Sequence, residues 1–561
     1  MGLLPSLVSD SFGYPKLSKS LKLNQIGGPA AKYFITQPEE DPLTDFKRLG
    51  VPIVLNWLRD CFDSHFLCPR KSFPRLPTRI LDVQPGSDAA RIRLHLSKGE
   101  EQEDYFILSY RWGGPQRCML NTLSLEDFKN GIVIADLPKT IADTIEVTRA
   151  LRCRYLWVDA LCILQDSEAD LSNELARMKD YYRRAFLAIQ PSGLLSANEA
   201  FLKRKGNSLT SGSIQLQNPS IQNCHSVEIP CVTVDGEIDT VVIDTAPDVY
   251  DPTKEPIHER AWVLQERLLC PRVLIFPLKA GFILQCDQTE KLHGKIFYNT
   301  HSERDAGNYR LPQKNAPHLM DTDRHMVLRS WWDIERDYAL RDLSEPNDKL
   351  VAIAALAEHF SDTYGTGLGT YCAGQWRNFM ADELQWTVAP HHIQPAPKQQ
   401  RAPSWSWASV DGGACHDIVT FLHPPSAVQV EDCTVVLKFP HNPFGPVESG
   451  LLKVKAHLLE VFWGPSNLKD TPPYGIFSSQ NGGEYLGAAL PDALENRPRS
   501  LVPIYLVPLA VAEGEKIWTA MLVRHIDGDV YRRVGGSKSW KNNDHGYDTL
   551  NHHPAQVFTL E

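Results

Sequence analysis

Hydrophobic residues in the first half of the chain follow two different periods. Short β-prone apolar runs at 106–110, 156–159 and 186–190 are typical of strands that are buried on both faces. In the intervening segments, 137–153 and roughly 168–185, apolar residues recur every three or four positions, as on one face of an amphipathic helix. The order strand, helix, strand, helix, strand predicts a three-layer α/β domain whose three strands are parallel neighbours in one sheet. Leu156 and Val158 lie in the apolar stretch YLWVDALCI, and we expect both to be inaccessible to solvent.

The segments around this pattern predict the rest of the first domain. TRILDVQP and RIRLHLS read as a β-hairpin that precedes the first central strand. We expect residues 1–78 to form a leading arm with one helix, and residues 79–290 to form the α/β domain. A polar, strand-like stretch at 200–255 is interpreted as a β insertion within that domain.

The second half of the chain changes from helical to β patterning. Trp262, Gln265, Glu266 and Leu269 share the spacing of one helix, and a pair of strands is predicted after it at 273–276 and 281–286. Further on, we expect helices over 327–360 and 366–386 within a helical region at 291–400, and a mostly antiparallel β region at 401–561. Trp405 and Trp407 alternate with serines, which predicts a strand whose tryptophans belong to the core.

Composition narrows the classes of partner and site. The chain has 561 residues, 42% of them hydrophobic, which is enough for about three domains of roughly 100 to 200 residues each. A formal net charge of −10 and a pI near 6.0 provide no electrostatic footprint for nucleic acid or an anionic membrane, so we expect neither as a partner. The sequence contains no run of 18 apolar residues, so we predict no membrane span.

The cysteines and short motifs exclude several kinds of chemistry. The twelve cysteines show no paired CxxC spacing, so we expect no metal site, no disulfide framework and a reducing, cytoplasmic location. The sequence also contains no GxGxxG, GxxxxGK[ST], HExxH or GxSxG.

Polar and aromatic residues follow the first central strand directly. Ser109, Tyr110, Arg111, Trp112 and Gly113 come immediately after the apolar run YFIL. In open α/β sheets, ligands bind just beyond the carboxyl ends of the strands. This turn is therefore a candidate small-molecule site, with the glycine allowing close approach of backbone and ligand.

Each candidate residue also has a structural interpretation. Arg111 is suited to a phosphate, or to a salt bridge with Asp159 at the end of the next strand. Trp112 is suited to stacking on a ring or to packing as a lid over the turn. Asp159 is suited to a ligand hydroxyl or, as we favour, to the backbone of its own turn. Gln265 and Glu266 face the pocket or, as we favour, pair on the helix surface with the neighbouring arginines, Arg260 and Arg267.

Four spaced motifs carry a family resemblance. They are YFILSYRWG at 105–113, LPKTIADTIEVTRALRCRYLWVDALCILQD at 137–166, NELARMKDYYRRA at 173–185 and RAWVLQERLLCPRVL at 260–274. Together they resemble the fungal heterokaryon-incompatibility (HET) domain family. Downstream pieces such as DKLVAIAALAE, YCAGQW, APSWSWAS and VYRRVG resemble the region after that domain in many full-length members, so the resemblance spans about 105 to 535.

The resemblance implies a fold and a candidate catalytic group. HET domains are thought to be distant relatives of TIR domains, which implies a TIR-like, flavodoxin-like parallel sheet. In TIR-like folds a glutamate on a later helix, often within Trp-x-x-Glu, contacts the ribose of NAD. The HET counterpart is commonly Asp-Trp-x-x-Glu, and here the stretch is Asp170-Leu171-Ser172-Asn173-Glu174. Glu174 is retained as the candidate catalytic carboxylate, while Leu171 replaces the aromatic; the structural alternative is that Glu174 pairs with Arg177 on a solvated face.

Three functions remain open at this point. The resemblance implies an NAD-cleaving effector of incompatibility and cell death, with NAD as substrate and no tightly bound cofactor. A second hypothesis is a recognition module that signals by self-assembly or by binding another incompatibility protein. The third is a small-molecule, secondary-metabolite biosynthetic enzyme on the same fold. A pocket at the sheet edge favours the first or third hypothesis, and a filled edge favours the second.

Overall fold

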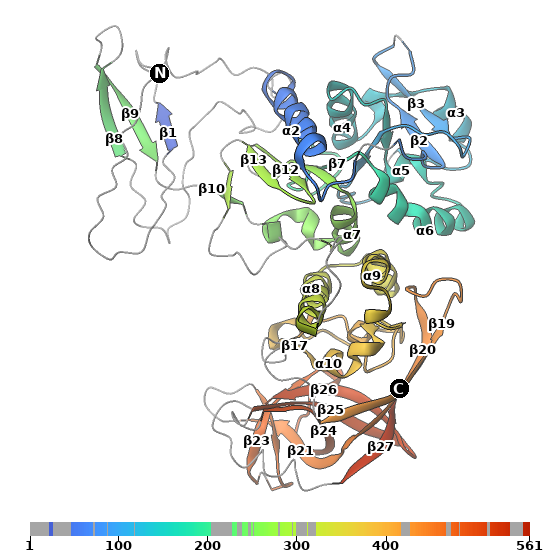
Figure 1. The fold of residues 1–561 in the computed structure, drawn as a ribbon, viewed down its shortest axis with the longest axis vertical. Helices are drawn as coiled ribbons and strands as arrows, with labels where there is room; N and C mark the ends of the chain where they lie inside the picture. The colour runs from blue at the N-terminus through green and yellow to red at the C-terminus, as the bar shows by residue number, and fades with distance from the viewer. Residues whose placement is uncertain are drawn as a thin grey trace.

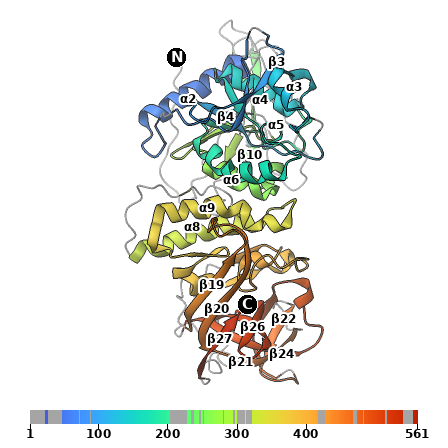
Figure 2. The same ribbon diagram turned by 90° about the vertical axis from the view of Figure 1, so that its right-hand side faces the viewer.

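A computed structural model describes most of the chain beyond residue 45. The described residues are 22–25, 46–202 without 71, 72, 87 and 117, 227–298 without 233–237, 245–247, 251, 279–280 and 294–295, residue 311, and 321–561 without 417–426, 467–472, 482, 513–516 and 539–553. Figures 1 and 2 agree that an α/β part, a helical part and a β part follow one another along the longest axis of the molecule. Within the described residues, no helix combines the length and apolarity needed to cross a bilayer.

The α/β part is built on one mixed sheet. Its described strands have the order β13-β12-β11-β7-β4-β6-β2-β3-β5. Their bounds are β2 Arg79–Asp82, β3 Arg91–Leu96, β4 Tyr105–Leu108, β5 Ile132–Val133, β6 Tyr155–Trp157, β7 Leu187–Gln190, β11 Arg272–Ile275, β12 Phe282–Cys286 and β13 Glu290–His293. Strands β6, β4, β7 and β11 are parallel neighbours, and the outer strands are antiparallel. The prediction of three parallel central strands is confirmed.

The helices cover both faces of this sheet (Figure 1). Helix α4 (Lys139–Ala150) connects β4 to β6, α6 (Glu168–Arg184) connects β6 to β7, and α7 (Ala261–Leu269) precedes β11. Because the chain steps from β4 to β6 in one direction and then to β7 and β11 in the other, right-handed crossovers place α4 on one face and α6 and α7 on the opposite face. The chain changes direction between β4 and β7, and their carboxyl ends therefore form the topological switch point of the sheet.

The centre of the sheet is a continuous apolar core. Leu156 and Val158 are fully buried, as predicted, and so is Ile107 on β4. Short elements complete this part: α3 Leu125–Asn130, the 3-10 turns Ile134–Asp136, Pro252–Lys254 and Pro256–Glu259, and α5 Asp159–Cys162.

The arm and the insertion meet at a separate small sheet. Strand β1 (Lys22–Gln25) pairs with β9 (Ile238–Asp244), which also pairs antiparallel with β8 (Val227–Val232) within the predicted β insertion. The helix predicted in the arm is α2 (Val51–Ser64), after a π-helical turn at Phe46–Gly50. Strand β10 (Asp248–Tyr250) pairs in parallel with β14 (Ile296–Tyr298). The parts of both predictions that fall on 1–21, 26–45 and 203–226 lie outside the described residues.

The helical part contains two long helices, α8 (Asp321–Ala339) and α9 (Val351–Tyr364). The helix predicted over 366–386 is wrong. That segment contains short elements because Gly369, Ala373 and Gly374 have positive φ angles, which end regular helix. The short elements of this part are the 3-10 turns Pro346–Lys349, Gly365–Gly367, Arg377–Phe379, Pro390–His392 and Trp407–Ser409, strands β15 Tyr371–Cys372, β16 Gln375–Trp376, β17 Trp386–Val388 and β18 Ala414–His416, and α10 Met380–Glu383.

Trp405 and Trp407 are core residues, as predicted, but they do not lie on a strand. Both are fully buried, and Trp407 begins a 3-10 turn. The Trp407 indole Nε1 donates to the Gly374 carbonyl at 3.0 Å, and the Trp405 backbone carbonyl accepts from Trp386 Nε1 at 3.0 Å.

The C-terminal part is the predicted antiparallel β region. Its described strands have the order β19-β20-β27-β26-β23-β22-β21-β24-β25, and β25 also pairs with β26, which closes six of them into a ring. The parallel pairing of β26 with β27 is an exception to the antiparallel pattern. The bounds are β19 Val428–Leu437, β20 Val447–His457, β21 Leu459–Pro465, β22 Tyr474–Phe477, β23 Tyr485–Pro491, β24 Val502–Ala512, β25 Ile517–Asp527, β26 Val530–Lys538 and β27 Ala555–Leu560, with a 3-10 turn at Leu494–Asn496.

Candidate functional site

The candidate site begins where β4 ends. All four residues of β4 are buried, and the next amide, Ser109 N, still donates to the Ile189 carbonyl on β7 at 3.0 Å. The chain then leaves the sheet through Tyr110 to Gly114. Gly113 has φ +69°, a conformation that side-chain-bearing residues rarely adopt. The turn therefore lies at the switch point of the sheet.

Gly113 is needed for packing of the protein against itself. A Cβ on this residue would lie 2.4 Å from the Leu195 carbonyl oxygen and 2.5 Å from Ser196 Cα. The space beside Gly113, where we predicted the close approach of a ligand, is therefore filled by the segment after β7.

Ser109 holds a buried glutamate on α7. Its Oγ donates to Glu266 Oε2 at 2.6 Å and accepts from Gln190 Nε2 at 3.3 Å. Burial raises the pKa of Glu266, while the Arg260 guanidinium and the Ser109 hydrogen bond oppose this rise. Among the described residues, Gln190 Oε1 is buried without a hydrogen-bond partner.

A second carboxylate, Asp159, lies beyond the end of the neighbouring strand β6. Trp112 Nε1 donates to Asp159 Oδ2 at 2.9 Å, and the Ala160 amide donates to Oδ1 at 2.6 Å. The interpretation that Asp159 binds its own turn is confirmed. The Tyr110 hydroxyl faces the same carboxylate without reaching hydrogen-bond geometry. Burial raises the pKa of Asp159, and the nearby Arg260 limits the rise.

Two arginines supply positive charge here. The Arg111 guanidinium pairs with the Glu259 carboxylate, and its Nη1 donates to the Pro256 carbonyl at 3.1 Å. The alternative of a salt bridge to Asp159 is therefore wrong, because Glu259 takes that place. Arg260 donates to the Tyr110 carbonyl and acts electrostatically on both Asp159 and Glu266. From the sequence we considered Arg260 only as a surface partner of Gln265 and Glu266. The available signal was its position, one residue before α7 and six residues before the buried Glu266.

Gln265 and Glu266 are both buried, so the favoured interpretation of helix-surface pairing is wrong. Helix α7 lies between the sheet and the helical part (Figure 1). Gln265 and Glu266 are only 4% and 6% exposed there. Arg267, their expected surface partner, is itself buried and donates from Nε to Gln285 Oε1 at 3.1 Å.

A cleft of about 500 Å³ opens beside the turn. Arg111, Trp112, Gly113 and Gly114 form one side of it. The remaining lining residues are Glu259, Arg260 and Trp262 from the start of α7, and Asp342, Leu343 and Ser344 from the segment after α8. Asp159 and Glu266 do not line it; Asp159 lies behind Trp112, and Glu266 lies behind Ser109.

The helical part forms one wall of this cleft. The Ala261 amide donates to the Asp342 carbonyl at 2.9 Å, and the Asp342 amide donates to the Glu259 carbonyl at 2.5 Å. Arg341 Nη2 lies 3.1 Å from His258 Nδ1. No local pattern in the sequence indicated this wall, because its two segments are about 80 residues apart.

Glu174 lies in a different group of side chains. It is buried on α6, accepts from the Tyr181 hydroxyl at 2.9 Å, and lies 4.0 Å from Arg79 Nη2. Arg79 also pairs with Asp170. The alternative of a solvated Arg177 pair is wrong, since Glu174 is buried and Arg177 Nη1 donates to Thr78 Oγ1 at 3.2 Å. Glu174 is not among the residues that line the cleft, and its catalytic role stays a prediction.

Comparison with known proteins identifies the part of the chain that holds this site. Residues 105–266 match the family model described as heterokaryon incompatibility protein (HET). No curated protein and no solved structure matches the chain significantly. The match begins at the first residue of β4 and ends at Glu266, so it includes Ser109 to Gly113, Asp159, Gln265 and Glu266. The chain therefore contains a heterokaryon-incompatibility (HET) domain at residues 105–266.

Proposed function

We propose that this HET protein is a TIR-like effector of incompatibility and cell death that binds NAD at the cleft and cleaves its nicotinamide–ribose bond. One observation carries the proposal: two desolvated carboxylates, Asp159 and Glu266, lie with Arg260 at the switch point of a parallel sheet. Ionisable groups with shifted pKa values beside a cleft are typical of functional sites. The strand order β6-β4-β7-β11 is the 2-1-3-4 order of flavodoxin-like sheets, which supports the TIR-like comparison.

The cleft offers the groups that a dinucleotide requires. Arg111 and Arg260 are cations suited to phosphate, and Trp112 and Trp262 are flat surfaces suited to a ring. Arg111 is held by the exposed Glu259 carboxylate, which a phosphate would replace. The cleft volume of about 500 Å³ is within the range of small-molecule sites.

We assign the role of the ribose carboxylate to Glu266, which does not line the cleft itself but lies directly behind Ser109 at the end of β4. Bond cleavage passes through an oxocarbenium-like transition state, which a carboxylate stabilises while neutral nicotinamide departs. Water then forms the new bond to the anomeric carbon and releases a proton. Glu266 lies on a helix four residues after Trp262, one residue more than in Trp-x-x-Glu, and it contacts the end of β4. Glu174, bound to Tyr181 and Arg79, lacks such a contact among its described hydrogen bonds.

Nicotinamide release by the full-length protein tests this assignment. The protein, its Glu266→Gln variant and its Glu174→Gln variant are incubated with NAD, and nicotinamide is quantified by chromatography. We expect release by the parent, a loss of about 100-fold or more in Glu266→Gln, and a rate within about ten-fold of the parent in Glu174→Gln. Circular dichroism verifies that the variants are folded. Loss of release in Glu174→Gln alone would return the role to Glu174, and no release by the folded parent would contradict the enzymatic proposal.

One observation favours a second candidate, a recognition module that acts by assembly. The polar groups of the turn already have partners: Arg111 has Glu259, Trp112 has Asp159, and Ser109 has Glu266. A turn that is satisfied within the chain needs no ligand to complete it. In that case the parent would release no nicotinamide, and light scattering would show it to assemble without NAD.

A further inference from the structure

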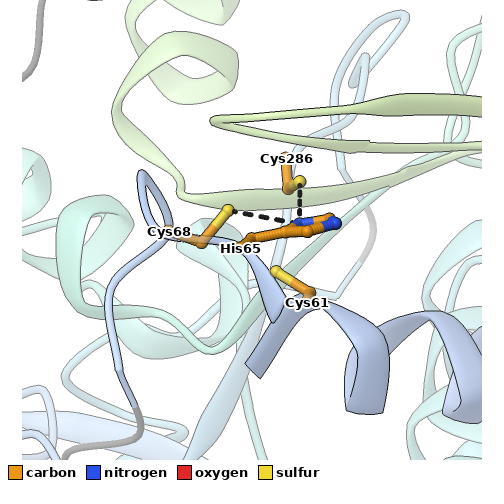
Figure 3. A group of neighbouring side chains, drawn as sticks. All are labelled: Cys61, His65, Cys68 and Cys286. Atoms are coloured by element: carbon orange, nitrogen blue, oxygen red, sulfur yellow. Dashed lines mark hydrogen bonds between the residues drawn. The ribbon is translucent and has the colours of Figure 1, made fainter. Parts of the chain in front are cut away.

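Four potential metal ligands converge at the edge of the α/β part, outside the HET match. They are Cys61, His65, Cys68 and Cys286, all of them buried. Cys61 lies on α2, His65 and Cys68 directly follow that helix, and Cys286 is the last residue of β12. Figure 3 shows the four side chains pointing toward one another from the end of the helix and from the strand.

The separations match a tetrahedral zinc centre. One ligand atom from each residue lies within 4.8 Å of all the others, and His65 Nδ1 lies 3.3 Å from Cys286 Sγ and 3.7 Å from Cys68 Sγ. Zinc–sulfur bonds of about 2.3 Å and zinc–nitrogen bonds of about 2.0 Å place tetrahedral ligands roughly 3.5 to 3.8 Å apart. The three sulfurs and one imidazole nitrogen therefore surround a volume of the right size.

The surroundings supply positive charge and hydrogen-bond donors to the sulfurs. Arg272 Nε lies 3.2 Å from Cys61 Sγ, and the Thr289 amide donates to Cys286 Sγ at 3.3 Å. Three thiolates and one Zn²⁺ carry a net charge of minus one, which the Arg272 guanidinium balances. Arg272 is itself fixed, by the Pro69 carbonyl at 2.7 Å and by the Phe62 ring.

We propose that Cys61, His65, Cys68 and Cys286 form a Cys₃His site that binds one structural Zn²⁺ ion. Four protein ligands leave no open position for substrate, which is the arrangement of structural zinc and not of catalytic zinc. The ion would join the C-terminal end of α2 to β12 and so fix the arm to the mixed sheet of the α/β part. Soft thiolates with imidazole in tetrahedral geometry select zinc over magnesium, calcium or manganese.

The sequence-based expectation of no metal site considered only local spacing. Cys61, His65 and Cys68 are separated by three and two residues, without a CxxC pair, and Cys286 follows His65 by 221 residues. The structure assembles the set from both sides of the HET match.

Metal analysis of the full-length protein tests the site. The protein is purified under reducing conditions without added chelator, and the number of zinc ions per chain is measured by inductively coupled plasma mass spectrometry. Replacement of zinc by Co²⁺ gives a visible spectrum that reports tetrahedral thiolate coordination. The variants Cys286→Ser and His65→Ala are compared with Cys270→Ser, a matched control in which a buried cysteine outside the cluster, hydrogen-bonded to the Arg272 carbonyl, is changed.

We expect one zinc per chain in the parent and in Cys270→Ser, with a tetrahedral thiolate Co²⁺ spectrum, and less than half that content in Cys286→Ser and His65→Ala. A chelator lowers the melting temperature of the parent and of Cys270→Ser but leaves that of Cys286→Ser unchanged. If Cys286→Ser or His65→Ala does not fold, the metal content and the cobalt spectrum of the parent still show whether the protein binds zinc through thiolates. Stoichiometric free thiols without metal, or a disulfide within the cluster, would overturn the proposal.

Discussion

At the scale of single residues, Glu266 and Asp159 are buried, and burial disfavours the ionised form of both carboxyl groups. Both have raised pKa values because burial removes water from the ionised carboxylate, and the Asp159 charge raises the pKa of Glu266 further. The positive charge of Arg260 offsets only part of this rise in pKa, since the Arg260 side chain is itself partly exposed. Such desolvated acids cost stability and are retained at sites where their chemistry is used.

This arrangement predicts how Glu266→Gln changes stability with pH. A carboxyl whose folded pKa is raised contributes stability that is present below its unfolded pKa of about 4.3 and lost as pH rises through the folded pKa. Glutamine avoids that loss and keeps an oxygen to accept the Ser109 hydroxyl. We expect the free energy of unfolding of Glu266→Gln to equal or exceed that of the parent by about 1 kcal/mol at pH 7.5, and the advantage to shrink at pH 5. Urea unfolding at both pH values measures it. A variant that is less stable than the parent, and more so at pH 7.5 than at pH 5, would contradict the argument.

At the scale of elements, the turn after β4 is positioned by packing against the segment that follows β7. Gly113 combines a positive φ angle with contact to Leu195 and Ser196. An alanine there is strained in its backbone and collides with backbone atoms of this neighbouring segment. The turn that carries Arg111 and Trp112 therefore depends on this one glycine.

Gly113→Ala tests that dependence. We expect a loss of about 2 to 4 kcal/mol in the free energy of unfolding, from a left-handed alanine and from overpacking. Gly86→Ala is the control, because a Cβ there meets nothing within 4 Å. Denaturant unfolding compares both variants with the parent. Equal stability of Gly113→Ala and Gly86→Ala would show that the turn is not fixed in this way.

The sequence predicted most elements of the HET domain because two kinds of burial are visible in it. β4, β6 and β7 are buried at every residue and read as continuous apolar runs, while α4 and α6 bury residues at helical spacing. The helix expected over 366–386 failed because its apolar residues are buried by glycine-rich turns, which periodicity does not distinguish from a helix.

The site was only partly predictable, for a related reason. Ser109 to Gly113 and Asp159 directly follow buried strands, so their position at the sheet edge could be inferred. Arg260, the wall at Asp342 to Ser344 and the Cys₃His cluster come together from segments far apart along the chain. Single-sequence patterns contain no information on such long-range contacts.

At the scale of the whole molecule, the helical part is attached to the HET domain beside the cleft. Lys179 on α6 pairs with Glu358 on α9 at 2.6 Å, and Arg183 donates to the Ala355 carbonyl at 3.1 Å. Together with the pairing of Ala261 and Asp342, these contacts fix the wall opposite Trp112. Contacts from outside the HET match therefore hold one wall of the cleft in place.

The affinity of a non-cleavable NAD analogue tests most directly the central claim that this cleft is a dinucleotide site. Binding is measured by calorimetry with the full-length parent, with Arg111→Gln, and with Arg154→Gln, a control that alters a half-exposed arginine at the amino end of β6. Because Arg111 is assigned to phosphate, we expect binding by the parent, about ten-fold or greater weakening in Arg111→Gln, and unchanged affinity in Arg154→Gln. No binding by the folded parent, or equal affinity in Arg111→Gln and the parent, would contradict it.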